Sequence, residues 1–177
     1  MVAALLLSLT LAAVPADASV RASVVLITLD TTRADHLGCY GGARTETPHL
    51  DALARSGVRF EQALSPVPLT LPAHVSILTG LVPRHHGVRD NLGFKLDPKI
   101  PLLTERLSAA GYTTAAFVSA AVLDRDGGLA RGFATYDDVV RVGDRRSFDY
   151  QERAASQTVD ALLKQLGTLK PPFFLWV

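Results

Sequence analysis

The chain alternates between continuous apolar runs and stretches in which apolar residues recur at helical spacing. Residues 23–29 (SVVLITL) and 171–177 (PPFFLWV) are continuous apolar runs, which are typical of parallel strands buried on both faces of a sheet. Residues 112–120, rich in Thr, Val and Phe, predict a further strand, and residues 58–64 predict a short one. Residues 124–146 are rich in Gly and charged side chains, so we expect a loop with little regular structure there.

Four stretches between and beside these strands predict helices. The first opens at Thr47-Pro48, where a capping residue precedes a proline suited to the first turn, and it stops at Gly57. The last has one apolar face that includes Leu162 and Leu166. The predicted helices cover residues 47–57, 72–79, 101–110 and 150–166. Strands and helices that alternate in this way predict an α/β fold with a largely parallel sheet.

The first fourteen residues, MVAALLLSLTLAAV, are apolar except for Ser8 and Thr10. This run is shorter than the ~20 residues that cross a bilayer and matches the ~7–15 residues of a signal-peptide core. Ala16 and Ala18 suit a cleavage site, although no Lys or Arg precedes the apolar run. We expect residues 1–18 to be a signal peptide that directs export to the periplasm or outside the cell. A buried first helix or a misassigned start is the alternative.

The other end of the chain closes on its final apolar run, with no turn or polar cap after it. In open α/β sheets, ligands bind at the carboxyl ends of the strands. A central strand that ends the chain lacks the segment that would follow it at this edge. We therefore expect the sequence to be a fragment of a longer protein, with a sheet that is incomplete at its C-terminus.

Composition limits the kinds of function that the chain can have. Of its 177 residues, 48% are hydrophobic and 20% are charged, and 18 Lys and Arg against 17 Asp and Glu leave a net charge of +1. This apolar content supports one folded core and excludes disorder for most of the chain. The near-neutral charge gives no electrostatic basis for binding nucleic acid. The single cysteine, Cys39, excludes a disulfide scaffold and multi-cysteine zinc sites.

Asp30 and Thr70 are candidate functional residues because each stands at the end of a predicted element. Asp30 follows the first strand, where a carboxylate is placed either to bind a hard cation or to form a turn. Thr70 starts a helix and lies between Pro68 and Pro72, and the helix dipole with its free N–H groups favours an anionic ester there. A threonine hydroxyl needs a base or a metal to act as a nucleophile. An ordinary N-cap role for Thr70 is the alternative.

Both residues lie within a pattern that resembles the N-terminal part of the sulfatases, metal-dependent ester hydrolases of the alkaline phosphatase superfamily. The resemblance is carried by VVLITLDTTRADHLGCYGGARTETPHLDALARSGVRFEQAL and PLTLPAHVSILTGLVPRHHGV, and it covers residues 22–177. It implies a three-layer α/β/α sandwich, of which these residues form the N-terminal portion. It also implies hydrolysis of a small anionic sulfate or phosphate ester, with one or two divalent metal ions (Zn²⁺, Ca²⁺ or Mg²⁺).

The resemblance also implies roles for single residues. Asp30 falls on the family's first metal-binding aspartate, and Thr31 falls where many sulfatases carry a second acidic ligand. Thr70 falls on the nucleophile position, which also contacts the metal. His74 stands where the family usually has arginine, one helical turn after Thr70. We expect His74 to hydrogen-bond the substrate's oxyanion or to orient Thr70.

A threonine at the nucleophile position departs from the sulfatase pattern. Sulfatases convert a Cys or Ser there to formylglycine, which Thr70 cannot form, and Cys39 lacks the proline and arginine spacing of that motif. Similar branches of the superfamily, including nucleotide pyrophosphatases and phosphodiesterases, use threonine with two metals. By this resemblance, Thr70 would attack phosphorus and form a phosphothreonine that water then hydrolyses. Phosphate esters are therefore favoured over sulfate esters.

Two other functions stay open. Phosphoethanolamine transferases of the same superfamily resemble this chain in using threonine, but they carry membrane segments, and here only the N-terminal run is comparably apolar. A non-catalytic module that binds an anionic ligand or a partner is the other, because no later Asp and His set is present to close a metal site. We expect the fragment alone to be inactive, with no nucleic acid partner and with membrane contact only through the targeting segment.

Several further polar residues admit two interpretations. Arg33 and Asp35 either steer an anionic substrate or, as we favour, pair with each other at the surface. His85 and His86 are adjacent, so we expect one at the rim of the pocket and the other in solvent. Asn91 either lines the pocket or caps a turn.

Overall fold

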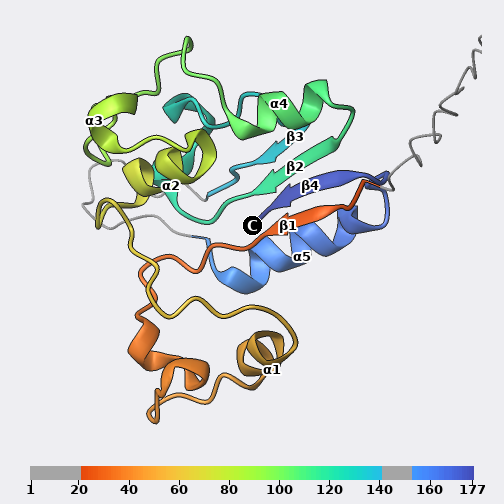
Figure 1. The fold of residues 1–177 in the computed structure, drawn as a ribbon. Helices are drawn as coiled ribbons and strands as arrows, with labels where there is room; N and C mark the ends of the chain where they lie inside the picture. Colours follow the sequence, from red (N-terminus) through yellow and green to blue (C-terminus); the bar gives the residue numbers. More distant parts are fainter. Residues whose placement is uncertain (1–20, 141–152) are drawn as a thin grey trace, which may run out of the picture.

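Four parallel strands form the centre of the computed structural model, which describes residues 21–140 and 153–177. They lie in the order β1-β4-β2-β3 and every pairing is parallel, so that the last strand of the sequence inserts between β1 and β2 (Figure 1). The parallel sheet confirms the predicted α/β fold. The strands are β1 (Val24–Leu26), β2 (Thr113–Phe117), β3 (Thr135–Asp137) and β4 (Phe173–Trp176).

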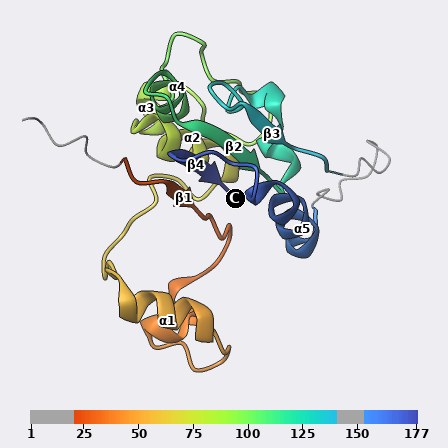
Figure 2. The same ribbon diagram turned by 90° about the vertical axis from the view of Figure 1, so that its right-hand side faces the viewer.

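Helices cover both faces of this sheet and give three layers. In Figures 1 and 2, α2, α3 and α4 lie on one side of the strands and α5 on the other, while α1 lies apart from the sheet. Within the described ranges, none of the helices is long and apolar enough to cross a membrane. The helices are α1 (Pro48–Ser56), α2 (Thr70–Thr79), α3 (Pro83–His86), α4 (Leu103–Ala109) and α5 (Ala155–Leu166), with 3₁₀ turns η1 (Ala34–His36), η2 (Gly38–Tyr40), η3 (Ala121–Leu123) and η4 (Arg125–Gly127).

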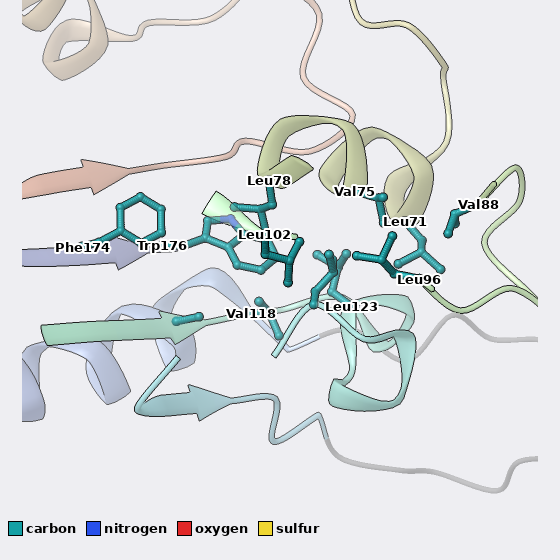
Figure 3. Close-up of a cluster of buried hydrophobic side chains, with 12 residues drawn as sticks. Leu71, Val75, Leu78, Val88, Leu96, Leu102, Val118, Leu123, Phe174 and Trp176 are labelled. Atoms are coloured by element: carbon teal, nitrogen blue, oxygen red, sulfur yellow. The ribbon is translucent and has the colours of Figure 1, made fainter. Parts of the chain in front are cut away.

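Alternation along β4 divides the core between the two layers of helices. Phe174 and Trp176, each 1% exposed, belong to a cluster with residues of α2 and with Leu102 and Leu123 (Figure 3). Leu175, between them in the strand, packs instead with a second cluster that reaches α5. Successive side chains of a strand point to opposite faces, so β4 contributes to both cores. This agrees with the prediction of a final strand buried on both faces.

The predicted elements differ from the structure at several places. The helix predicted over 150–166 begins at Ala155, with residues 153 and 154 outside it, and the short helix α3 lies where no helix was predicted. β1 is the edge strand of the described sheet and Val25 is 50% exposed, so the expected burial on both faces is wrong for β1. Residues 58–64 form no strand, and Val58 is 83% exposed because no neighbouring strand pairs with this segment. The loop expected at 124–146 contains β3, which pairs with β2 on the side away from β4. The segment 1–18, where we expect a signal peptide, lies outside the described residues.

The segment before α1 is held together by one half-buried carboxylate. Thr47 occupies the N-cap position of α1 but does not cap the helix. Its hydroxyl accepts a hydrogen bond from Gly38 N–H at 2.8 Å and donates to Asp51 Oδ1 at 3.0 Å. The same oxygen of Asp51 accepts from Cys39 N–H at 2.7 Å. The GCYG and TPHLD motifs therefore have a shared structural role, which is to join η2 to α1.

We predict that Gly132 is the glycine whose replacement most disturbs the core. Its φ is 78°, and an added Cβ would collide with the backbone of Glu105. Gly132→Ala should lower the free energy of unfolding by more than about 3 kcal/mol. Gly80→Ala is the matched control, because Gly80 has φ 70° but open space around it, and the conformational penalty alone is about 1–2 kcal/mol. Urea unfolding followed by the fluorescence of Trp176 measures both, and equal losses would contradict the steric argument.

Candidate functional site

The carboxyl ends of β1, β4 and β2 border a cavity of about 540 Å³. This is the edge at which open α/β sheets bind ligands. Polar groups reach it from four directions: the segment after β1, helix α2, the segment after β2 and the start of α5. The cavity is lined by Thr28, Leu29, Asp30, Thr32, His74, Val118, Ser119, Ala120, Leu123, Arg153, Ala154, Ala155, Trp176 and Val177.

Asp30 and Thr70, forty residues apart in sequence, are joined by a hydrogen bond. The Thr70 hydroxyl donates to Asp30 Oδ2 at 2.8 Å, while Oδ1 of the same carboxylate accepts from Thr31 N–H at 2.9 Å. Thr70 is the first residue of α2, and the N-cap position belongs to Leu69. The N-cap interpretation of Thr70 is therefore wrong, because its hydroxyl bonds a carboxylate across the site instead of the helix backbone.

Asn91 caps the helix on which Thr70 stands. Leu71 N–H, in the first turn of α2, donates to Asn91 Oδ1 at 2.9 Å. Of the two interpretations of Asn91, the structure therefore shows capping, and the capped backbone is that of the residue next to Thr70. Because this contact fixes the first turn, it also limits the directions in which the Thr70 hydroxyl can point.

His74 is buried beneath Thr70 on the same face of α2. Its ring is 4% exposed and lies 5.4 Å from the Trp176 ring. Nδ1 is 2.8 Å from the Thr70 carbonyl oxygen, which can only accept, so Nδ1 carries a proton. Burial lowers the pKa of His74 below its usual value, although the Thr70 carbonyl and the Asp30 charge act in the opposite direction. The ring is thus neutral near pH 7, and Nε2 is an acceptor without a partner among the described residues.

Thr31 lies beside this group, but its hydroxyl is not joined to it. Thr31 has φ 55°, a left-handed conformation that is strained for a β-branched residue. Its N–H binds Asp30, whereas its hydroxyl makes no hydrogen bond with any described residue and the side chain does not line the cavity. The structure therefore brings together Asp30, Thr70 and His74, and the role of Thr31 as a ligand stays a prediction.

The paired histidines after α2 have separate environments. His85 is exposed, as expected for one of the pair. His86 is 2% exposed and lies in the protein interior, so the expected place at the pocket rim is wrong. Its Nδ1 accepts from Val88 N–H at 3.2 Å, and Nε2 lies 3.0 Å from Ser76 Oγ, which donates to the Pro72 carbonyl at 2.9 Å. His86 therefore stabilises the position of α2 through its contact with Ser76, which belongs to that helix.

Arg33 and Asp35 form the surface pair that we favoured. Arg33 Nη2 lies 2.6 Å from Asp35 Oδ2, and both side chains are largely exposed. Neither residue lines the cavity. The ion pair therefore lies at the surface, outside the lining of the cavity.

The oxygen donors at the site are of the kind that divalent cations prefer, but they are fewer than a full set of ligands. The Asp30 carboxylate and the Thr70 hydroxyl are oxygen donors, which hard cations prefer, yet Ca²⁺ takes ~6–8 such ligands. Within residues 21–140 and 153–177, no three His, Cys, Asp or Glu side chains gather in a group able to hold a metal. Asp30 and Thr70 alone therefore offer fewer oxygen donors than such a cation takes.

Comparisons with known proteins match this same part of the chain. The family model described as Sulfatase matches residues 22–177. An arylsulfatase of Clostridium perfringens is 37% identical over 95 residues, which are 52% of this chain and 19% of that protein. The solved phosphonate monoester hydrolase of Agrobacterium radiobacter has a TM-score of 0.69 at 21% identity, covering 89% of this chain and 40% of its own.

A second solved structure shows a protein in complex with its substrate, D-glucosamine-2-N,6-O-disulfate. It has a TM-score of 0.72 at 20% identity and covers 88% of this chain and 33% of its own. At such identities the likeness of the structures shows the fold alone. This chain spans less than half the length of each of these relatives.

We predict that His86 makes stability depend on pH. Burial lowers the pKa of His86 in the folded state, so the unfolded chain binds more protons as the pH falls through about 6.5. The free energy of unfolding should therefore decrease between about pH 7.5 and pH 5.5. His86→Gln should reduce this decrease, and His85→Gln, at an exposed position, should leave it unchanged. Urea midpoints at the two pH values test this, and an unaltered decrease in His86→Gln would contradict it.

Proposed function

Because the chain belongs to the sulfatase family, we propose that it forms the nucleophile-bearing part of a metal-dependent hydrolase of sulfate or phosphate esters. In this proposal Thr70 is the nucleophile, and Asp30 and Thr70 are ligands of a divalent cation. The observation that carries it is the 2.8 Å hydrogen bond from the Thr70 hydroxyl to the Asp30 carboxylate. A threonine in a merely structural N-cap would direct its oxygen at the helix backbone.

The geometry supports attack by Thr70 on the ester. Its hydroxyl already donates to Asp30 Oδ2, so the proton moves toward that carboxylate as Oγ1 forms a bond to phosphorus or sulfur. The bond from phosphorus or sulfur to the ester oxygen breaks, and that oxygen leaves as the alcohol after it takes up the proton that Asp30 accepted. Water then attacks the phosphorus or sulfur of the threonine ester, the bond to Oγ1 breaks, one proton of the water returns to Oγ1, and the phosphate or sulfate product is released.

The start of α2 favours the anionic substrate. Thr70 is the first residue of this ten-residue helix, whose N-terminus carries partial positive charge. Asn91 accepts the hydrogen bond of the Leu71 N–H and so fixes the first turn of α2. His74 fixes the Thr70 carbonyl through Nδ1, which makes it a positioning residue for the nucleophile.

A divalent cation bound by Asp30 and Thr70 would polarise the ester and lower the pKa of the attacking hydroxyl. The oxygen donors present here favour Ca²⁺ or Mg²⁺. The acceptor Nε2 of His74, which has no partner among the described residues, is the one nitrogen of this group that would suit Zn²⁺. The Thr31 hydroxyl is a further candidate ligand, since its backbone already contacts Asp30.

We place phosphate esters ahead of sulfate esters as substrates. The carbon that carries the Thr70 hydroxyl also carries a methyl group, so it cannot be oxidised to the aldehyde by which a sulfate can leave through elimination. The covalent intermediate must therefore be hydrolysed at phosphorus or sulfur. Relatives named for a phosphonate substrate and for a sulfated sugar share the fold, and a small anionic ester of either kind is the expected substrate.

We predict that Thr70 is required for hydrolysis by the full-length protein. Thr70→Ala should lower kcat/KM for 4-nitrophenyl esters by about a thousandfold or more, whereas Thr70→Ser should retain part of the activity because it keeps a hydroxyl. Thr79→Ala is the control, since the Thr79 hydroxyl contacts only backbone: it donates to the Val75 carbonyl in its own helix and accepts from Leu81 N–H. Comparing a phosphodiester, a phosphonate and a sulfate, each with and without added divalent metal, identifies the substrate class.

Two results would overturn this proposal. Normal hydrolysis by Thr70→Ala would remove Thr70 from the chemistry. Transfer of the phosphoryl or sulfuryl group to an alcohol, without release of the free anion, would identify a transferase. Mass spectrometry of the acid-quenched reaction tests the intermediate directly, because the proposal places one phosphoryl or sulfuryl group on Thr70.

We also propose that the protein is exported, on the basis of the apolar N-terminal run. Expressed in a Gram-negative host, the protein should be found in the periplasm with residues 1–18 removed. Leu6→Asp, which interrupts the apolar core, should keep it in the cytoplasm, and Ser8→Ala should not. An intact N-terminus on a protein found only in the cytoplasm would contradict the proposal.

A further inference from the structure

The N-terminus of α5 borders the same cavity as Asp30, whose carboxylate accepts a hydrogen bond from the proposed nucleophile, Thr70. Ala154 and Ala155 line the cavity, and Ala154, the N-cap of this twelve-residue helix, supplies no side-chain cap. The first backbone bonds of the helix are donated by Gln157 and Thr158 to the Ala154 carbonyl. Among the described residues, the N–H groups of Ala155 and Ser156 have no hydrogen-bond partner, as is usual for the first turn of a helix without a side-chain cap.

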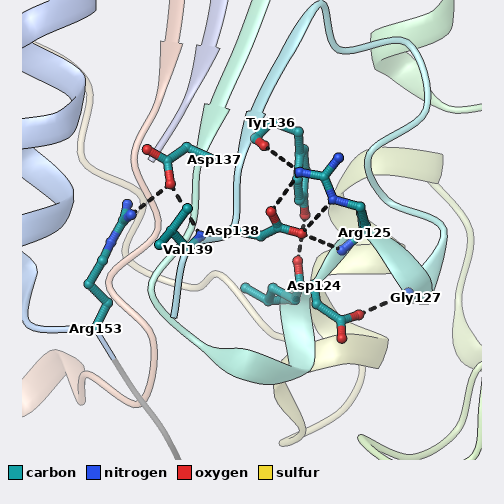
Figure 4. A network of polar contacts seen from close by, with 9 residues as sticks. Asp124, Arg125, Gly127, Tyr136, Asp137, Asp138, Val139 and Arg153 are labelled. Carbon is teal, nitrogen blue, oxygen red and sulfur yellow. Dashed lines mark hydrogen bonds and ion pairs between the residues drawn. The ribbon is translucent and has the colours of Figure 1, made fainter. Parts of the chain in front are cut away.

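Arg153, the residue before this helix start, brings a buried guanidinium to the same place. Its side chain is 8% exposed. Nε donates to Thr158 Oγ1 at 2.9 Å. Nη1 donates to Asp137 Oδ1 at 2.7 Å, the contact drawn in Figure 4. Nη2 is buried without a hydrogen-bond partner among the described residues. Buried polar groups in folded proteins are almost always paired, so this unsatisfied donor indicates a missing acceptor.

Ser119 completes the arrangement from the end of β2. Its carbonyl accepts from Arg153 N–H at 2.9 Å, and its hydroxyl lies 2.6 Å from Thr158 Oγ1. Since Thr158 Oγ1 already accepts from Arg153 Nε, its own hydrogen is free to be donated to Ser119 Oγ. The Ser119 hydrogen is then available on the cavity wall.

The charges around Arg153 favour the binding of an anion with modest affinity. Asp137 neutralises the Arg153 charge and also accepts from Val139 N–H at 3.2 Å, so the ion pair fixes the guanidinium without leaving a full positive charge. The uncapped helix adds a partial positive charge at its N-terminus. Arg153 Nη2 and the N–H groups of Ala155 and Ser156 have no acceptor among the described residues, so an oxygen-rich anion matches the site.

We propose that Arg153, Ser119 and the N-terminus of α5 form an anion subsite that binds a second, non-reacting sulfate, phosphate or carboxylate group of the substrate. This rests on the proposed function, because it assumes that the ester reacts at Thr70, whose hydroxyl is hydrogen-bonded to the cavity residue Asp30. The substrate is then an ester that carries a further acidic group remote from the bond that breaks.

Inorganic sulfate is the probe, and Trp176 is the reporter. Trp176 lines the cavity and is the only tryptophan of the chain. Titration with sodium sulfate should change its fluorescence with a saturable dependence, while sodium chloride at matched ionic strength should not. Sodium phosphate and sodium acetate, titrated in the same way, rank the three anion classes.

Two variants remove different donors of the subsite. Arg153→Gln should raise the dissociation constant for sulfate by about tenfold or more, since charge-assisted hydrogen bonds are lost. Ala155→Pro removes one free N–H at the first helical position, where proline is tolerated, and Ala154 already has φ −57° and ψ 140°, which suits a residue before proline. It should raise the constant severalfold while the helix stays intact. Arg33→Gln, at an exposed arginine outside the cavity, is the control and should change nothing.

The outcomes separate this subsite from the proposed catalytic function. Unaltered sulfate affinity in Ala155→Pro and in a folded Arg153→Gln would overturn the subsite. So would a loss of affinity in Thr70→Ala alone, because the anion would then bind at the reacting position. Normal ester hydrolysis by Thr70→Ala would overturn the catalytic proposal, and sulfate binding that depends on Arg153 and Ala155 would stand independently of it.

Discussion

The position of β4 between β1 and β2 is the constraint on which the site depends. Parallel pairing of Val24 with Phe174 and of Thr113 with Phe173 aligns the carboxyl ends of three strands at one edge. The segments that leave those ends carry Asp30 and Ser119, so residues from distant parts of the sequence border one cavity. Because β4 supplies buried side chains to both faces of the sheet, the same strand that organises the site also joins the two cores.

Much of this arrangement could be predicted from local patterns. Continuous apolar runs identified β1 and β4, and glycine after helical spacing identified the ends of α1 and α2. The position of Asp30 beyond a buried-strand pattern, together with the proline-framed start at Thr70, indicated a common site, and the structure joins the two by a hydrogen bond. These features are local, so a single sequence reveals them.

The parts that could not be predicted depend on tertiary contacts. β3 has only three residues and no apolar run, and it exists because β2 offers it a neighbouring edge. His86 acquires its role from Ser76, ten residues away, and Asn91 from Leu71, twenty residues away. Arg153 follows a charged stretch that resembles a loop in sequence, and nothing local distinguishes a buried guanidinium from a solvated one.

The two ends of the cavity differ in charge, and this difference affects the entry of an anionic ester. At the Asp30 end, a carboxylate stands next to the proposed nucleophile; it would repel an anion at 4 Å by about 1 kcal/mol in water and more where water is excluded. Burial lowers the pKa of His74, which disfavours a positive charge on this ring that would offset the repulsion. The N-terminus of α2 compensates in part. The cation proposed at Asp30 would reverse the sign at that end, so with no positive side chain beside it the binding of an anionic ester would depend on that cation.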